Sequence, residues 1–575
     1  MRVLLIATLL WTSLQNPVPP GTSQPQPTIA SAQALLGSGD ATGAKAMLEK
    51  IVKAGPTDTR AWQVLGNVCL GPRLKDFACA VSAFSKVLEL RPDDPQALLS
   101  IGVAHVARGD IEAAFQFLAR ARASKRIDMS QLTTNPLVEP LKKDPRYAAL
   151  LPVPADFANP FVEPTKIVHE WSGEAPGDGF GWIARSIGDV DGDGAQDFVT
   201  SSPTFGTGGA NRGRVYVYSS KSGRLLWTAD GQPGDRLGIG LEAAGDVNRD
   251  GAGDVIASAP GGAFARVYDG KTGAVLLTLK GGEPSEIFGR HTSGIGDVSG
   301  DKYPDLIVGA PGGPPPPSAA SGASAPSGPP ADFSGRAYIF SGKDGSLIFT
   351  LKGERGGDGF GSAVSGATVD GKTTIVVGAA AGGPARTGRA YVYTSLTEKP
   401  AFVIDGDATD RALAAMFVGV PGDLDADGVP DVYASDWAGA AKGPGTGRVY
   451  LHSGRSGQML YAFTGETAGD GFGSTQATAG DVDGDGTPDL ILGAWQYGGA
   501  AISGGRAYLY SGKTGKLLKT FTNRIPGDTF AFDAVGIGDV DADGTVDLLI
   551  TGGGSAINGF RSGRVFIISS GVKSR

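Results

Sequence analysis

The chain has 575 residues, more than one ordinary core can organise, which predicts at least two domains. Its formal net charge is −8 and its pI is about 5.2, and no lysine or arginine block interrupts the sequence, so the composition excludes a nucleic-acid-binding protein. Glycine, at 91 residues, has roughly twice its usual share and occurs in short clusters, which indicates many tight turns.

The first 27 residues predict a signal peptide and a flexible tether. Arg2 precedes an apolar run at 3–11, which is shorter than the roughly 20 residues needed to cross a bilayer. No other stretch is apolar enough to cross one. We therefore expect no transmembrane segment after signal cleavage, and a protein that is secreted, periplasmic or at the cell surface.

Residues 28–150 have a helical pattern that repeats. The recurring positions are Ala44, Leu48 and Pro56 against Ala80, Phe84 and Pro92, and Trp62-Leu65-Gly66 against Leu98-Ile101-Gly102. The 36-residue offset exceeds the ~34-residue tetratricopeptide period, which places an insertion in LGPRLKD (70–76). The stretch resembles about two and a half tetratricopeptide repeats, and the resemblance implies a groove that binds a peptide or a partner protein.

Two short features lie in this helical region. Cys69 and Cys79 could pair after export, or remain two buried thiols, and the sequence leaves both open. Arg108-Gly109-Asp110 spells the tripeptide that integrins recognise. Its position matches the Gly-Asp turn between two repeat helices, so we interpret it as structural.

Residues 151–164 are predicted to be a linker, and from 165 to 573 the period becomes about 57 residues. Each unit has a Phe-Gly pair, an acidic loop, an apolar strand, a glycine-rich loop, a GR[VA]Y strand, a tight turn and a last strand. Four short strands per unit predict a β-propeller blade. The Phe-Gly copies are Phe180-Gly181, Leu237-Gly238, Phe288-Gly289, Phe360-Gly361, Phe472-Gly473 and Phe530-Ala531, with the fifth copy obscure near Leu413.

The two ends of this region predict a closed ring of seven blades. The last unit stops after 563–569 and lacks its fourth strand, while the first carries a surplus strand, KIVHEW (166–171). Placing that strand on the last blade completes it and removes the exposed sheet edges. A Pro/Ser/Ala-rich insertion at 312–335 lengthens the third unit and is predicted to be disordered. The fold class is thus an all-α helical repeat followed by an all-β seven-bladed β-propeller.

The acidic loops have the spacing D-x-D-x-D-G-x-x-D. Side chains at positions one, three, five and nine can converge around one cation, the glycine at position six permits the bend, and such oxygen ligands suit Ca²⁺. Four loops are complete: Asp189, Asp191, Asp193, Asp197; Asp423, Asp425, Asp427, Asp431; Asp481, Asp483, Asp485, Asp489; and Asp539, Asp541, Asp543, Asp547. The second loop keeps Asp246, Asn248, Asp250 and Asp254, and the third keeps Asp297, Ser299, Asp301 and Asp305 but has Lys302 at the glycine position. The fourth, at 366–374, has lost the ligands.

The order Phe-Gly, acidic loop, Gly-Ala-Pro (309–311) is similar to the FG-GAP repeats of the integrin α-chain N-terminal propeller. The resemblance covers about 165–573. It implies calcium in the loops, where the metal braces the blades from one rim, and an adhesive or ligand-binding use.

The sequence offers no catalytic constellation. His105, His169, His291 and His452 have no metal-triad or nucleophile–base spacing. We therefore predict non-catalytic recognition or adhesion, with a protein or glycan ligand on the propeller face. A glycan-binding lectin is the main alternative. A quinoprotein enzyme is a weaker alternative, because residues 214–227 also look like blade repeats of pyrroloquinoline-quinone dehydrogenases.

Two sets of side chains complete the predictions for the propeller. Four aromatic rings are candidates for stacking on a sugar or peptide, or for packing between blades: Phe205, Trp437, Trp495 and Tyr497. An arginine begins the third strand of every blade, and its sevenfold recurrence predicts a structural hydrogen bond. These arginines are Arg214, Arg266, Arg336, Arg389, Arg448, Arg506 and Arg564.

Overall fold

The computed structural model describes residues 27–206, 209–282, 286–312, 334–475 and 477–573. It divides into two compact units, one ending at Pro152 and the other beginning at Val153. The predicted signal peptide and almost all of the insertion at 312–335 lie outside the described residues. Within the described ranges, no helix has both the length and the apolar character that a membrane crossing requires.

The first unit consists of paired helices. An aspartate caps the N-terminus of each helix from α2 to α6, and its side chain accepts a backbone N–H of the first turn. The helices are α1 (Ile29–Gly37), α2 (Ala41–Ala54), α3 (Thr59–Leu70), α4 (Phe77–Leu90), α5 (Pro95–Arg108) and α6 (Ile111–Ala123). Four 3₁₀ helices follow: η1 (Met129–Thr133), η2 (Pro136–Lys143), η3 (Pro145–Leu150) and, after the division, η4 (Pro154–Phe157). Three successive helix pairs confirm the tetratricopeptide-like prediction.

Glycine allows the helices of a pair to approach closely. A Cβ on Gly66 would lie 2.5 Å from the Phe84 ring, and one on Gly102 would lie 2.7 Å from Leu118. The predicted insertion forms the longer loop between α3 and α4. Cys69 and Cys79 form a disulfide across that loop, with their Cα atoms 5.8 Å apart, which settles the choice that the sequence left open.

The Arg-Gly-Asp tripeptide has the structural role that was predicted for it. Gly109 ends α5 with a φ of 83°, a left-handed conformation that favours glycine, and Asp110 caps α6. The Asp110 carboxylate is therefore engaged with the Ala113 N–H and with the His105 ring.

The second unit consists of seven four-stranded antiparallel sheets, each formed by four consecutive strands except the last. The first three blades contain β2 (Ala184–Gly188), β3 (Asp197–Ser202), β4 (Arg214–Tyr218) and β5 (Leu225–Asp230); β6 (Leu241–Gly245), β7 (Asp254–Ala259), β8 (Phe264–Tyr268) and β9 (Val275–Lys280); and β10 (His291–Gly296), β11 (Asp305–Ala310), β12 (Arg336–Phe340) and β13 (Leu347–Lys352). The next three contain β14 (Phe360–Val369), β15 (Lys372–Ala379), β16 (Arg389–Tyr393) and β17 (Phe402–Asp405); β18 (Val418–Gly422), β19 (Asp431–Asp436), β20 (Arg448–His452) and β21 (Met459–Thr464); and β22 (Ala477–Gly480), β23 (Asp489–Ala494), β24 (Arg506–Tyr510) and β25 (Leu517–Thr522).

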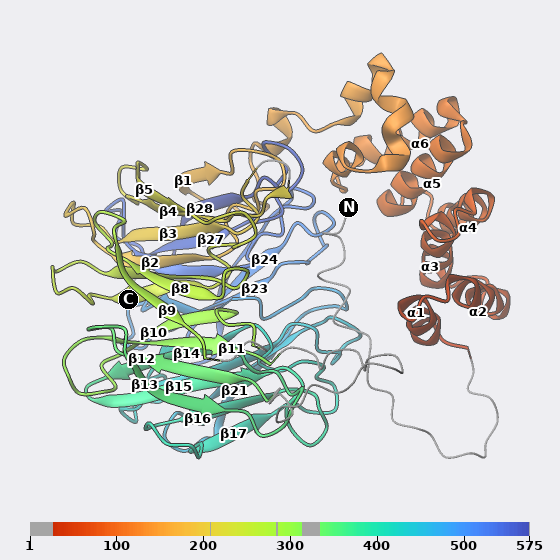
Figure 1. Cartoon of the computed structure of the whole chain (residues 1–575). Helices are drawn as coiled ribbons and strands as arrows, with labels where there is room; N and C mark the ends of the chain where they lie inside the picture. The colour runs from red at the N-terminus through yellow and green to blue at the C-terminus, as the bar shows by residue number, and fades with distance from the viewer. Residues whose placement is uncertain (1–26, 207–208, 283–285, 313–333, 476, 574–575) are drawn as a thin grey trace, which may run out of the picture. The chain divides into compact units, whose positions relative to one another are not determined.

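The seventh blade joins the two ends of the propeller. Its strands are β26 (Ala534–Gly538), β27 (Asp547–Thr551) and β28 (Arg564–Ser569), with β1 (Ile167–Ser172) as the fourth. Figure 1 shows β1 beside β28, and the two strands pair from Ile167↔Ile568 to Ser172↔Arg564. The predicted closure by the N-terminal strand is confirmed.

The Phe-Gly motif supplies the packing between blades. Phe180, Phe360 and Phe530 are at most 1% exposed, and each lies in a core cluster that includes strands of two blades. In the fifth blade Leu413 occupies the phenylalanine position, because its backbone bridges Gly388 as that of Phe530 bridges Gly505. The obscure fifth copy is therefore a Leu-Ala pair.

The segment predicted as a linker contributes to the second unit. Phe161 is 6% exposed and packs edge-on against Phe530 and Phe566 of the seventh blade. Phe157 is also buried and lies against Ile525. The chain before β1 thus adds apolar contacts at the blade where the ring closes.

Candidate functional site

Each acidic loop connects the first and second strands of its blade, so the seven loops occupy equivalent positions. In the first loop the backbone bends around the Asp189 carboxylate. One of its oxygens accepts from the Gly192 and Asp193 N–H groups, and the other accepts from the Gly194 N–H at 2.9 Å. Gly194 has a φ of 89°, which is why the spacing requires glycine there. The carboxylates of Asp191 and Asp197 thereby come close to that of Asp189.

The carboxylate at position nine is buried and fixes the loop to its blade. In the first loop, Asp197 accepts the Val190 N–H at 2.9 Å with one oxygen and the Ser220 N–H of the strand 3–4 turn at 3.0 Å with the other. Burial raises the pKa of Asp197 to about 6 and that of Asp431 to about 7. A cation bound beside these groups would compensate the cost of burying their charge.

The four loops that the sequence predicts to be complete are also the loops where three carboxylate oxygens lie within 4.8 Å of one another. In three of them, positions one, three and nine come together: Asp189, Asp191, Asp197; Asp423, Asp425, Asp431; and Asp481, Asp483, Asp489. Position five is not part of these groups. Its carboxylate contacts the neighbouring turn instead, as where Asp193 accepts from the Ser219 hydroxyl at 3.2 Å.

Of the three incomplete loops, the second and third keep the bend of the complete loops and the fourth does not. Lys302 has a φ of 72°, so the third loop keeps its bend although a side chain occupies the glycine position, and the Lys302 N–H still reaches Asp297 at 2.8 Å. The second loop keeps the same N–H contact between Gly251 and Asp246. In the fourth blade, β14 and β15 instead run into a tight hairpin whose paired residues extend to Val369↔Lys372.

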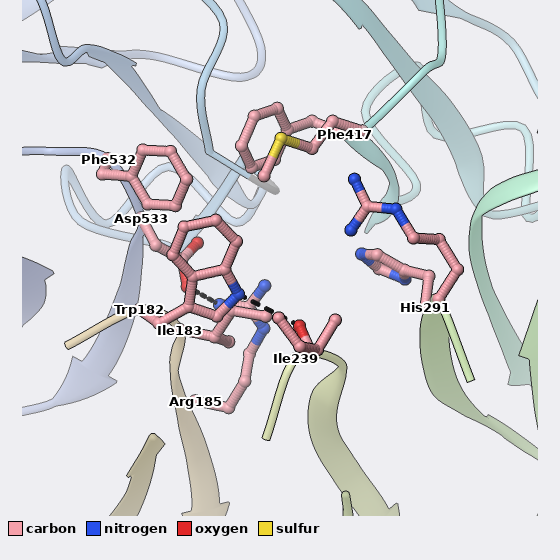
Figure 2. A pocket seen from close by; sticks show the side chains of 10 residues that line it. Trp182, Ile183, Arg185, Ile239, His291, Phe417, Phe532 and Asp533 are labelled. Atoms are coloured by element: carbon pink, nitrogen blue, oxygen red, sulfur yellow. Dashed lines mark hydrogen bonds and ion pairs between the residues drawn. The ribbon is translucent and has the colours of Figure 1, made fainter. Parts of the chain in front are cut away.

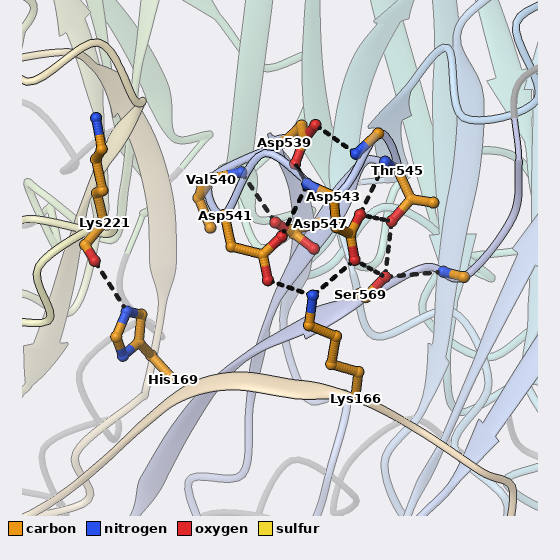
Figure 3. Close-up of polar contacts among 12 residues, drawn as sticks. Lys166, His169, Lys221, Asp539, Val540, Asp541, Asp543, Thr545, Asp547 and Ser569 are labelled. Carbon is orange, nitrogen blue, oxygen red and sulfur yellow. Dashed lines mark hydrogen bonds and ion pairs between the residues drawn. The ribbon is translucent and has the colours of Figure 1, made fainter.

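The seventh loop already contains a cation supplied by the chain. Lys166, directly before β1, places its Nζ 2.6 Å from Asp541 and 2.8 Å from Asp543 (Figure 3). This contact lowers the pKa of Asp543 to about 2. Here positions one, three and five form the carboxylate group, because Asp543 turns inward.

This lysine has counterparts that each contact a single aspartate. In other blades a basic residue of the strand 3–4 turn donates to the backbone carbonyl at position five, as Lys271 does to Asp250 at 2.7 Å and Lys513 to Asp485 at 3.1 Å, and Lys271 also lies 3.2 Å from the Asp250 carboxylate. The seventh blade has no such turn, since its fourth strand is β1. Lys166 takes that place and reaches the carboxylates.

The strand-three arginines make the structural contacts predicted for them in six blades. Arg214 forms a bidentate pair with Asp230 at 2.5 and 2.8 Å, and Arg506 binds Glu466 at 2.7 Å. The others pair with Glu286 (Arg336), Asp405 (Arg389), Asp407 (Arg448) and Glu170 (Arg564). The prediction is wrong for the second blade, because strand three begins there at Phe264, which pairs with Lys280 as Arg214 pairs with Asp230. Arg266 follows two residues later and lies over the Phe264 ring.

Two of the four predicted ligand-binding rings are covered by these arginines. The guanidinium of Arg214 lies 3.8 Å from the centre of the Phe205 ring, and that of Arg506 lies 4.1 Å from the centre of Tyr497. Both rings therefore have a structural partner. As ligand residues they remain predictions.

The other two rings belong to an aromatic cluster at the Phe-Gly end of the innermost strands. Its members are Trp182, Phe417, Trp437, Trp495 and Phe532. Phe532 is central, with ring centres 4.9 Å from Trp182, 5.9 Å from Phe417 and 5.6 Å from Trp495. Sequence reasoning missed Trp182 and Phe532, although both directly follow a Phe-Gly or Phe-Ala pair.

A hollow beside this cluster marks the mouth of the central channel. Figure 2 shows the rings of Trp182, Phe532 and Phe417 along one side and His291 across from them. Below them the buried Arg185 forms ion pairs with Glu242 of β6 and Asp533, the residue before β26. This ion triad connects three neighbouring blades.

The four histidines all have structural surroundings. His105 contacts Asp110 at 3.1 Å, His169 the Lys221 carbonyl at 3.1 Å, and His452 the Gly457 carbonyl at 2.9 Å. Burial lowers the pKa of His291 to about 3, so this ring is neutral at physiological pH.

Comparisons with known proteins agree with this geometry. The FG-GAP repeat model matches residues 180–218, an FG-GAP-like repeat model matches 423–492, and a tetratricopeptide repeat model matches 73–127. Integrin alpha-7 of Homo sapiens is 32% identical over 160 residues, which cover 24% of this chain and 13% of that protein. Integrin alpha-6 of Gallus gallus is 31% identical over 164 residues, covering 25% and 14%, and integrin alpha-PS2 of Drosophila melanogaster is 31% identical over 186 residues, covering 25% and 13%.

The matched part is a small share of the integrin α chains, so the likeness concerns the propeller and not those whole proteins. Within this chain the matched repeats fall in the helical unit and in the first, fifth and sixth blades. The chain is thus built from tetratricopeptide repeats and an integrin-α-like propeller of FG-GAP repeats.

Proposed function

We propose that the chain is an exported, calcium-binding protein of recognition or adhesion, without catalytic activity of its own. The observation that carries this proposal is the convergence of carboxylates in the four complete loops, at equivalent positions of a closed propeller. A ring that needs several bound ions to stabilise its rim is suited to presenting a fixed surface to a ligand.

The chemistry of the loops fits calcium. All the converging donors are oxygens, which Ca²⁺ takes in numbers of six to eight. Calcium would supply charge compensation and would connect the two strands that each loop joins.

Integrin α chains are similar to this propeller, and that similarity supports recognition of a protein ligand. The helical unit supports a second interaction, because tetratricopeptide arrays bind peptides and partner proteins. Its cavity of about 370 Å³ between α6 and η3 is lined by Phe115, Ala119 and Leu150, and is of a size for a few side chains.

Two experiments on the full chain test this proposal. Calorimetric titration of the metal-free protein with CaCl₂ counts the ions; we expect at least four, and a count of zero would refute the calcium site. A random-peptide display library and a glycan array, each screened with calcium and with chelator, then identify the ligand class. Calcium-dependent peptide binding supports the proposal, whereas glycan binding alone would favour the lectin alternative and a quinone absorbance band would favour the enzyme.

A further inference from the structure

Two neighbouring arginines, Arg290 and Arg236, have no counter-charge among the described residues, and they are close enough for their positive charges to repel. Arg290 directly follows Phe288-Gly289 and lines the hollow beside the aromatic cluster. Arg236 directly precedes Leu237-Gly238 of the neighbouring blade. Each donates its backbone N–H, to Gly309 and Asn211 respectively, but neither guanidinium has a hydrogen-bond or ion-pair partner within the described residues.

This arrangement is unfavourable unless an anion is present. Both side chains are half-buried. Burial, together with the positive charge of Arg236, lowers the pKa of Arg290, and no carboxylate offsets these effects. The nearest acidic groups of the hollow are already engaged, because Asp533 and Glu242 both bind Arg185. Removing a guanidinium group from water without pairing it is unfavourable, in proportion to how much of the group is buried.

The walls of the hollow indicate what accompanies the anion. The hollow is lined by the apolar side chains of Trp182, Ile239, Met416, Phe417 and Phe532. The closed part of the hollow has room for about one water molecule, so a ligand would lie across its open mouth. Arg290 and the aromatic rings line that mouth, and together they favour a charged group attached to an apolar or aromatic body.

A cation is the alternative occupant, since aromatic faces attract cations. The charge of Arg290 beside the cluster opposes it. We propose that Arg236 and Arg290 bind a carboxylate of the propeller's ligand at the channel mouth, while the aromatic cluster holds the apolar part next to it. This inference names the ligand chemistry of the face assigned under the proposed function, and rests on it.

The test uses the full chain and simple probes. We expect 3-phenylpropionate to bind in the millimolar range and to shift the indole N–H resonance of Trp182, whose Nε1 donates to the Ile239 carbonyl at 3.1 Å. The Trp182→Phe variant assigns that resonance. The uncharged 3-phenylpropanol and the cationic 3-phenylpropylamine should cause no saturable shift. A Phe-Asp dipeptide with acetylated and amidated ends carries its only carboxylate on the aspartate side chain. Comparing it with 3-phenylpropionate shows whether the site takes a peptide side chain or a small carboxylic acid, and binding of either one supports the proposal.

Charge-removing variants locate the site. Arg290→Gln and Arg236→Gln should each weaken phenylpropionate binding by about tenfold or more, as expected for a charge-assisted hydrogen bond. Neither should lower the melting temperature, because an unpaired charge is removed; the exposed Arg224→Gln serves as the matched control, with unchanged binding. If Arg290→Gln does not fold, Arg236→Gln decides the question.

Two results would overturn the inference: no saturable shift by either carboxylate, or unchanged affinity in both variants. The calcium titration on the same sample separates this failure from that of the proposed function, since calcium binding does not depend on these two arginines.

Discussion

Calcium should stabilise the propeller by an amount that can be calculated from the number of loops. Extracellular calcium modules bind with dissociation constants of about 10⁻⁴ to 10⁻³ M. At about 10 mM free calcium, each site then adds roughly 1.4 to 2.7 kcal/mol to the free energy of unfolding. Four loops bring three carboxylates together, which gives a total of about 6 to 11 kcal/mol.

That free energy corresponds to a modest shift of the melting temperature, because the domain is large. The unfolding entropy of about 2.1 cal/mol/K per residue makes 1 kcal/mol equivalent to roughly 1 °C for a propeller of this size. Calorimetric scans in calcium and in chelator should therefore differ by about 6 to 12 °C. Magnesium at the same concentration should give a smaller shift, because it keeps its waters and tolerates less distortion of its octahedral geometry.

A single-loop variant tests the assignment of this shift. Asp423→Asn combined with Asp425→Asn removes two charges from the fifth-blade group and should remove about a quarter of the calcium increment. Its metal-free melting temperature should stay within a degree or two of the parent, since like-charge repulsion is relieved at the same time. Asp370→Asn, in the fourth-blade hairpin between β14 and β15, is the matched control and should keep the full increment. Equal melting curves in calcium and chelator, or a full increment in the double variant, would show that the loops are only turns.

Three further predictions address separate features. Replacing Lys166 with Met should tighten calcium binding at the seventh loop, because the ammonium no longer competes for Asp541 and Asp543; an unchanged isotherm would contradict this. Burial raises the pKa of Asp547 to about 7 from an unfolded value near 3.9, so its stabilising contribution is present below about pH 4 and is lost as the pH rises through 7. The metal-free protein should therefore gain stability as the pH falls from 8 to 5, and the Asp547→Asn variant should gain less. The calcium-bound form should release its metal over the same pH range. Reduction of the Cys69–Cys79 disulfide should destabilise the helical unit by about 2 to 3 kcal/mol in urea unfolding, as expected for a loop of 10 residues of separation, and the double serine variant should be insensitive to reductant.

Repetition explains why so much of the fold could be predicted from the sequence. One blade's strand and turn pattern is ambiguous alone, but seven registered copies, with a missing strand at one end and a surplus strand at the other, allowed only a closed ring. The same repetition located the acidic loops, and the recurring arginine indicated a structural contact. In the second blade Phe264 occupies the position of that arginine, and Arg266, two residues later, lies over the Phe264 ring.

The features that escaped prediction are those that break the repeat. Lys166 precedes the surplus strand, whereas in other blades the basic residue stands in the strand 3–4 turn, so nothing in the sequence placed Lys166 against Asp541. The insertion of one residue after Leu413-Ala414 concealed the fifth Phe-Gly position. Phe161 lay in a stretch with no period at all, yet it packs into the closing blade.

The channel mouth shows the same relation between repetition and function. The residue that follows the Phe-Gly pair is tryptophan, isoleucine, arginine, serine, serine and phenylalanine in the blades where the pair is plain. A position required by the fold is nearly uniform, as the arginine of strand three is in six blades, whereas this position varies between blades, and Trp182, Ile239, Arg290 and Phe532 line one hollow. The repeat thus brings four unlike side chains together, and such an asymmetric surface is suited to the selective binding of one ligand. The symmetric residues therefore maintain the ring, and the chemistry that distinguishes this propeller resides in Trp182, Arg290 and Phe532, where the repeat is not kept.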